Sequence, residues 1–129
     1  MRKLQQPTHY TCCQTCLAVL SKKTVREVVD IVDISGIMTK PKIIEALKKL
    51  KIKHKRLKYS HGVVKNIKKA LVQIVNRRQK ISHLIIKKNT KIYDPWYGEI
   101  FNLEKYTKKQ MKGFVYNWYI ELGGLNEVL

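Results

Sequence analysis

The chain has 129 residues, 44% of them hydrophobic, and a formal net charge of +18. This length fits one folded domain, and the apolar content is enough for a core, which argues against an intrinsically disordered chain. No apolar run approaches the length of a membrane span, and polar residues follow the basic start where a secretory signal would be apolar. We therefore expect a protein of the cytoplasm with a single domain over residues 1–129.

The first third of the chain predicts helices. After a polar lead-in, the compact apolar run at residues 12–20 predicts a short buried helix that begins near Cys12. Thr24 and Glu27 have the spacing of a capping box, which predicts the start of a second helix. Thr39, with a proline two residues later, predicts the start of another.

The middle of the chain predicts one strand and one further helix. Residues 52–59 alternate weakly between apolar and polar side chains and predict a strand. After Gly62, apolar residues recur at helical spacing and predict a third amphipathic helix. Its apolar positions are Val63, Val64, Ile67, Leu71, Ile74 and Val75.

The last third changes to β-strands. Residues 82–86 predict one strand, residues 88–90 a turn, and residues 91–94 a return strand that Pro95 ends. The aromatic segment 114–122 is β-prone and is expected to close the sheet. Helices therefore precede an antiparallel sheet, which predicts an α+β fold.

The positive charge is concentrated in the middle of the chain. The segment from Lys40 to Lys91 holds 18 lysines and arginines and one acidic residue, Glu45, whereas the rest holds 9 basic and 8 acidic residues. Such a field attracts acidic partners: nucleic acid, anionic membrane surfaces or acidic protein faces. The excess is mostly lysine, however, and a solvated surface encoded by an AT-rich bacterial or phage genome would have the same composition. Both interpretations stay open at this point.

The three cysteines all lie between positions 12 and 16, so they cannot form a distributed disulfide framework, and a reducing compartment is expected. A cysteine at a helix N-terminus has its thiolate stabilised by the helix dipole and by free backbone N–H groups. Because the thiolate is the nucleophilic form, Cys12 is a candidate nucleophile. It then needs a base nearby and a group that orients the base.

Four histidines compete for the role of base. His83 stands at the start of an apolar strand, which is a rigid position. His54 and His61 lie in lysine-rich segments that are expected to be exposed, and His9 lies on the lead-in. A lone histidine on a strand more often has a structural role, but the predicted hairpin supplies a partner.

That partner is Asp94. A two-residue turn at positions 89–90 would place Asp94 opposite Ile85, on the same face as His83 and one diagonal step away. Diagonal neighbours are roughly 7–8 Å apart, which side chains can span, so the carboxylate could hold the imidazole in the tautomer that accepts a thiol proton. A three-residue turn would put Asp94 on the other face. An aspartate before a proline can also simply initiate a turn.

Acyl transfer to a thiolate also creates an oxyanion, which needs hydrogen-bond donors. Gln6 precedes Cys12 by six residues, so a bend could bring its amide beside the backbone N–H of the nucleophile. Gln5 is an alternative donor, and both glutamines could be surface residues.

These residues resemble the papain-like peptidase domain that removes double-glycine leader peptides from bacteriocins and is often fused to export transporters. That family has a Gln, a catalytic Cys six residues later and a Leu-Ala-hydrophobic run, then a distant His on a short apolar strand and an Asp-Pro pair with a Gly. The matching residues span nearly the whole chain: Gln6, Cys12, Cys16, Leu17, Ala18, Val19, His83, Leu84, Ile85, Ile86, Asp94, Pro95 and Gly98.

The resemblance implies a papain-like α+β fold, with an active cleft between a helical half and a sheet half, and a peptidase without cofactor or metal. Cys12 would be the nucleophile, His83 the base and Asp94 the group that orients the base. The Gln6 amide would help to bind the oxyanion. The substrate would be a peptide or protein. These 129 residues include no transporter segment, so the resemblance does not imply leader processing in particular.

The chain departs from the family pattern at the nucleophile. The family usually has Asp-Cys-Gly where this chain has Thr11, Cys12 and Cys13. This departure leaves Cys13 open as the nucleophile. It also leaves an alternative function: an inactive papain-like module whose basic surface binds nucleic acid or an acidic protein. The aromatic residues lie outside the basic runs and are expected to be mostly core, unlike those of a base-stacking surface.

Two other kinds of site would use the same cysteines. His9, Cys12, Cys13 and Cys16 have intervals that could hold one zinc ion. Adjacent cysteines suit a tetrahedral site poorly, however, and Cys16 is expected in the core. Cys13 and Cys16 also form a CxxC pair, but without the βαβ context of a redox protein.

Overall fold

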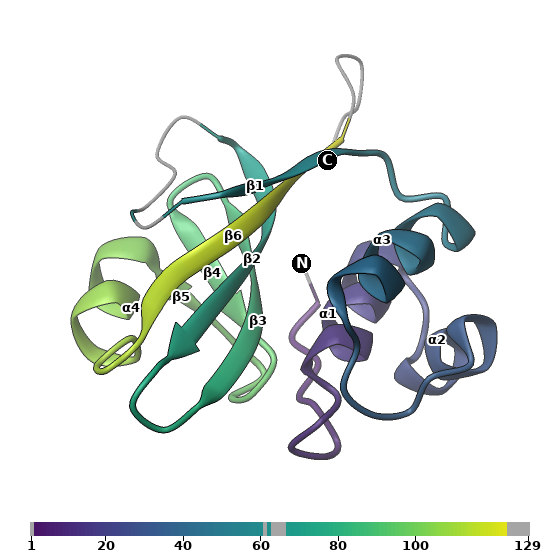
Figure 1. Cartoon of the computed structure of the whole chain (residues 1–129), viewed down its shortest axis with the longest axis horizontal. Coiled ribbons are helices and arrows are strands. Elements are labelled where there is room, and N and C mark those ends of the chain that lie inside the picture. The colour runs from purple at the N-terminus through teal and green to yellow at the C-terminus, as the bar shows by residue number, and fades with distance from the viewer. Residues whose placement is uncertain (1, 61, 63–66, 124–129) are drawn as a thin grey trace.

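The chain begins with helices and continues into a sheet (Figure 1), in a computed structural model that describes residues 2–60, 62 and 67–123. The helical half consists of α1 (Cys12–Ser21), α2 (Val25–Val32) and α3 (Lys40–Lys49). The predicted start of α1 at Cys12 is confirmed, as is the capping box of α2, in which Thr24 and Glu27 cap each other's backbone N–H groups. The predicted N-cap of α3, Thr39, is confirmed as well.

The described part of the second half forms a six-stranded antiparallel sheet in the order β1-β6-β2-β3-β4-β5. A short helix, α4 (Leu103–Lys109), follows β5. The predicted α+β order of helices before an antiparallel sheet is therefore confirmed. The strands are β1 (His54–Tyr59), β2 (Lys69–Asn76), β3 (Ile81–Lys88), β4 (Lys91–Asp94), β5 (Glu99–Asn102) and β6 (Val115–Leu122).

The sheet has a buried cluster on each face. Leu71, Leu84 and Trp118 point toward the helical half and pack with α1 and its neighbours. Ala70 and Ile85, next to them in sequence, belong to the second cluster, which contains Tyr106 of α4 and Met111. Successive side chains of a strand point to opposite faces, so α1–α3 and α4 cover different faces of the sheet. Figure 1 shows these helices on opposite sides.

The helix predicted after Gly62 is wrong: Leu71, Ile74 and Val75 lie on the central strand β2, and Ile67 lies just before it. Both faces of β2 are covered, so it reads as a nearly continuous apolar run, which periodicity does not separate from a buried helix. Val63 and Val64 lie outside the described residues. The predicted strand at 114–122 is β6, which lies inside the sheet between β1 and β2.

The hairpin of β3 and β4 has the predicted register. Lys88 pairs with Lys91 and Ile86 with Tyr93 across a two-residue turn, in which Asn89 adopts the left-handed conformation with φ 55°. Asp94 therefore ends β4 beside the start of β3. α1 packs against β3, which brings the start of the helix to the same place. Among the described residues, no helix is long and apolar enough to cross a membrane.

Candidate active site

A cleft of about 590 Å³ lies between the helical half and the sheet. Cys12 and Cys13 contribute to its wall from α1, and His83 and Asp94 contribute from the hairpin. The fold thus brings three of the four sequence-predicted site residues to one cavity, although more than seventy positions separate Cys12 from His83.

Cys12 is the first residue of α1, a free and half-buried cysteine. The N-cap residue, Thr11, makes no side-chain hydrogen bond to the first turn, so backbone N–H groups there are not capped by a side chain. The pKa of Cys12 is lowered to about 5. A hydrogen bond with the Cys13 thiol has the largest effect, and the hydrogen bond and charge of His83 add to it, together outweighing burial. The thiolate is therefore the stable form of Cys12 at neutral pH.

The other two cysteines have the opposite character. Cys13 is buried, and its hydrogen bond with Cys12, together with burial, raises the pKa of its thiol well above the usual value. Cys16 is fully buried in the core, where its thiol donates to the Leu84 carbonyl over 3.5 Å, and burial raises its pKa too. Cys12 is thus the one cysteine of the three with a lowered pKa.

Labelling should assign the reactive cysteine. We expect iodoacetamide at pH 7 to modify Cys12 and to spare Cys13 and Cys16, because only the first is a thiolate at this pH. Replacing Cys13 with alanine should keep the label on Cys12 and raise the pKa of Cys12, since it removes the most effective hydrogen bond. Peptide mass mapping locates the label. Rapid modification of Cys13, and not of Cys12, in the wild-type protein would assign the nucleophile to Cys13 instead.

His83 is bonded to Asp94 within the cleft. Its Nε2 lies 2.5 Å from Asp94 Oδ1, and both side chains are largely buried. Because Asp94 occupies Nε2, Nδ1 is the ring nitrogen left to interact with Cys12. Burial alone would lower the pKa of His83, but the hydrogen bonds and charges of Asp94 and Cys12 raise it to about 9. Between about pH 5 and pH 9, Cys12 and His83 therefore form a thiolate–imidazolium pair.

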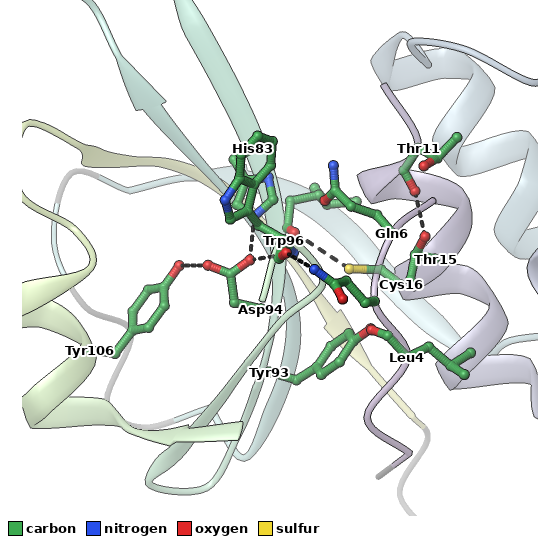
Figure 2. A network of polar contacts seen from close by, with 12 residues as sticks. Leu4, Gln6, Thr11, Thr15, Cys16, His83, Tyr93, Asp94, Trp96 and Tyr106 are labelled. Atoms are coloured by element: carbon green, nitrogen blue, oxygen red, sulfur yellow. Dashed lines mark hydrogen bonds and ion pairs between the residues drawn. The ribbon is translucent and has the colours of Figure 1, made fainter. Parts of the chain in front are cut away.

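Asp94 is itself held by two further donors (Figure 2). The Trp96 backbone N–H donates to Oδ1 over 2.9 Å, and the Tyr106 hydroxyl donates to Oδ2 over 2.6 Å. The carboxylate is almost inaccessible to solvent, so these bonds fix its rotamer. Tyr106 was not a sequence-predicted site residue. It lies on α4, a helix that the pattern did not predict, and nothing in the sequence links it to Asp94.

Trp96 packs beside His83. The residue is 43% exposed, and its ring meets the His83 ring edge-on, with centroids 6.5 Å apart. The His9 ring also packs against Trp96, with centroids 5.0 Å apart. The expectation that the aromatic residues are mostly core holds for Tyr93, Tyr116 and Trp118, but Trp96 and Tyr97 are exposed.

Gln6 is buried near the start of α1 but is not part of the cleft wall. Its amide nitrogen donates to the Thr8 carbonyl over 2.8 Å, and its backbone N–H donates to the Pro95 carbonyl. An amide nitrogen carries two hydrogens, so this one bond does not use the whole donor. Gln5, the alternative, is exposed and donates to the Trp96 carbonyl.

The remaining candidates for the site can be placed as follows. His54, expected to be exposed, is half-buried on β1, and His61 lies outside the described residues. The described part of the chain holds no group of three or more His, Cys, Asp or Glu side chains that could bind a metal ion. The proposed zinc ligands near the start of α1 do not converge, because Cys16 points into the core toward Leu84.

A comparison of the chain with models of protein families found no match, and a comparison with curated proteins found none either.

Proposed function

We propose that this protein is a cysteine peptidase with a papain-like fold, similar to the domains that remove double-glycine leader peptides. The observation that carries the proposal is the row formed by Cys12, His83 and Asp94 at a cleft. Its two reactive groups have pKa values shifted in opposite directions, to about 5 and about 9. A nucleophile, a base and a group that orients the base are the minimal parts of a thiol-dependent acyl transfer.

In the proposed reaction the Cys12 thiolate attacks the carbonyl carbon of a peptide bond, and the carbonyl oxygen becomes an oxyanion. Backbone N–H groups at the start of α1 stabilise this charge. The Gln6 amide is the proposed second donor, and it would have to turn from the Thr8 carbonyl toward the cleft to reach the oxyanion. As the C–N bond breaks, the His83 imidazolium gives its proton to the leaving amine. A thioester on Cys12 and a neutral His83 result.

In the second half-reaction a water molecule gives a proton to neutral His83 and attacks the thioester carbonyl. The C–S bond breaks, Cys12 leaves as a thiolate, and His83 is again an imidazolium. Asp94 keeps Nδ1 directed at Cys12 throughout, since its own carboxylate is held by Tyr106 and the Trp96 backbone.

The proposal is tested by cleavage of a complex peptide mixture. The protein is incubated with a library of peptides from a digested proteome, and new termini are identified by mass spectrometry. We expect new termini with the wild-type protein and none with a Cys12→Ala variant, which serves as the matched control. Equal termini from both proteins would contradict the proposal, as would a wild-type protein that cleaves nothing while its Cys12 is shown to be alkylated slowly.

A second candidate function, binding of nucleic acid, is favoured by a basic hollow outside the cleft. Four lysines surround this shallow hollow over a floor that includes Leu47 and Ile52. Lys55 pairs with Glu121 at 2.6 Å, but the other three take part in no ion pair within the described residues. Lysine ammonium groups around an apolar floor suit a phosphate with an attached sugar or base. The lysines are Lys48, Lys51, Lys53 and Lys55.

Two triple variants that each lose three positive charges test whether binding depends on this hollow or on the general positive charge. Lys48, Lys51 and Lys53 are changed to Gln in one, and the lysines at 105, 109 and 112, near α4, in the other. We expect the first to weaken binding of a labelled single-stranded oligonucleotide by tenfold or more. It should also reduce the slope of log affinity against log salt by about 2, because about 0.7 ions are released per contact. Equal losses in both variants would show that no local site exists.

A further inference from the structure

Gln14 is a fully buried polar residue two positions after Cys12 in α1. Its amide nitrogen donates to the Ile34 carbonyl over 2.9 Å and to the Gly36 carbonyl over 2.7 Å. One side chain therefore uses both amide hydrogens on two carbonyls of a single loop, which connects α2 to α3 (Figure 1).

The geometry of this amide fixes its orientation. Exchanging the nitrogen and oxygen would point Oε1 at two carbonyl oxygens, which repel it. In the observed orientation Oε1 is buried without a partner among the described residues. An unpaired buried acceptor is unfavourable, and an apolar side chain at this position would avoid it. The feature that sets Gln14 apart from such a side chain is its pair of bonds to the loop.

The loop has few other polar restraints. Among the described residues, no backbone–backbone hydrogen bond is made by residues 34–38. Besides Gln14, the Met38 backbone lies near the Cys13 thiol, where it acts to lower the pKa of that group. The bonds from Gln14 and the contact at Cys13 both involve the first turn of α1. They therefore set the position of the loop relative to Cys12.

The held loop forms part of the wall of the cleft that Cys12 and Cys13 also line. Met38 is buried and Ile37 is 74% exposed, and both side chains line the cleft. In a peptidase the leaving amine takes its proton from His83 and departs on that side, whereas the acyl part stays attached to the cysteine. A wall beside Cys12 and Cys13 therefore contacts the acyl part of the substrate.

We propose that Gln14 is a positioning residue, whose amide holds residues 34–38 against α1 so that Ile37 and Met38 form the acyl-side wall of the cleft. This inference rests on the proposed peptidase function. Gln14 itself touches no substrate. It acts through the loop, and its loss should change which acyl groups are accepted while leaving the thiolate of Cys12 unchanged.

The test compares a large and a small reagent on the same cysteine. The large reagents are tripeptide chloromethyl ketones, one with Leu-Leu-Gly and one with Gly-Gly-Gly, and the small one is iodoacetamide. In the wild-type protein we expect the leucine reagent to modify Cys12 about tenfold faster than the glycine reagent, the discrimination typical of an apolar pocket. Gln14→Met, which keeps size and helix propensity but donates no hydrogen bond, should reduce this ratio to about two or less.

Two further variants give matched controls. Ile37→Ser alters the wall without touching the tether and should reduce the ratio similarly. The leucine-to-glycine ratio of the double variant should be no lower than that of the more affected single variant, because both changes remove the same interaction. Iodoacetamide should modify Cys12 within about twofold of the wild-type rate in all three, since none of them touches the thiolate–imidazolium pair.

The tether is also measured without any cysteine reagent. Limited proteolysis by an added protease should cut within residues 34–38 faster in Gln14→Met, and cutting within the sheet should not change. Unchanged cutting of the loop would overturn the inference, as would a leucine-to-glycine ratio that Gln14→Met leaves intact. A wild-type Cys12 that is inert to iodoacetamide would instead contradict the proposed function, so the two failures are distinguishable.

Discussion

Replacing His83 with alanine should move the midpoint of Cys12 alkylation upward by at least about two pH units from its wild-type value near 5, toward the free-thiol range near 8.5. The hydrogen bond and the positive charge of His83 both lower the pKa of Cys12, and the variant removes both. Part of the lowering of the Cys12 pKa should persist in the variant, because the hydrogen bond with Cys13 has the largest effect and remains. Iodoacetamide rates measured from pH 4 to pH 10 give the midpoint.

The same variant should lose peptidase activity by about 10³-fold or more, since it also lacks the acid that protonates the leaving amine. His54→Ala is the control, because His54 lies on β1 and outside the cleft. The proposed mechanism would be wrong if His83→Ala kept the wild-type midpoint, or if His54→Ala shifted it equally.

Asp94→Ala should destabilise the fold by about 3–5 kcal/mol, because it removes one partner of a buried charged pair. Three donors lose their acceptor at once: His83 Nε2, the Trp96 backbone N–H and the Tyr106 hydroxyl. Asp94→Asn should cost less, about 1–2 kcal/mol, since the amide oxygen can still accept from His83 and Trp96 while its nitrogen donates to the Tyr106 oxygen. Urea unfolding measures both free energies.

Both variants should lower the pKa of His83 from its value of about 9, because the carboxylate raises it. The imidazolium donates the proton to the leaving group, so activity should decline at a lower pH on the alkaline side than in the wild-type protein. Nuclear magnetic resonance titration of the His83 ring measures the pKa directly. Equal stability losses in the alanine and asparagine variants would show that the three hydrogen bonds do not hold Asp94 as described.

The contact between His83 and Asp94 could be predicted because it depends on local geometry. The number of residues in the hairpin turn determines the register of the two strands, and the register determines which side chains share a face. The same holds for the start of α1 at Cys12 and for the capping box at Thr24 and Glu27, where a few neighbouring residues specify the structure.

Features that depend on distant segments could not be predicted in this way. β2 is covered on both faces, so its apolar run lacks the alternation that identifies a strand. The bond from Tyr106 to Asp94 requires α4 to pack against β4 and β5, and the bonds from Gln14 to the Ile34 and Gly36 carbonyls depend on how α1 meets the α2–α3 loop. No spacing along the sequence encodes these contacts.

The most direct test of the proposed active site is the pH dependence of alkylation of each cysteine in the wild-type protein, followed by iodoacetamide labelling and peptide mass mapping. The lowered pKa of Cys12 predicts a rate that rises with pH through a midpoint near 5, while Cys13 and Cys16 remain unlabelled in the folded protein. A midpoint for Cys12 near the free-thiol value of about 8.5 would contradict the account, because the cleft would then hold no thiolate–imidazolium pair at neutral pH.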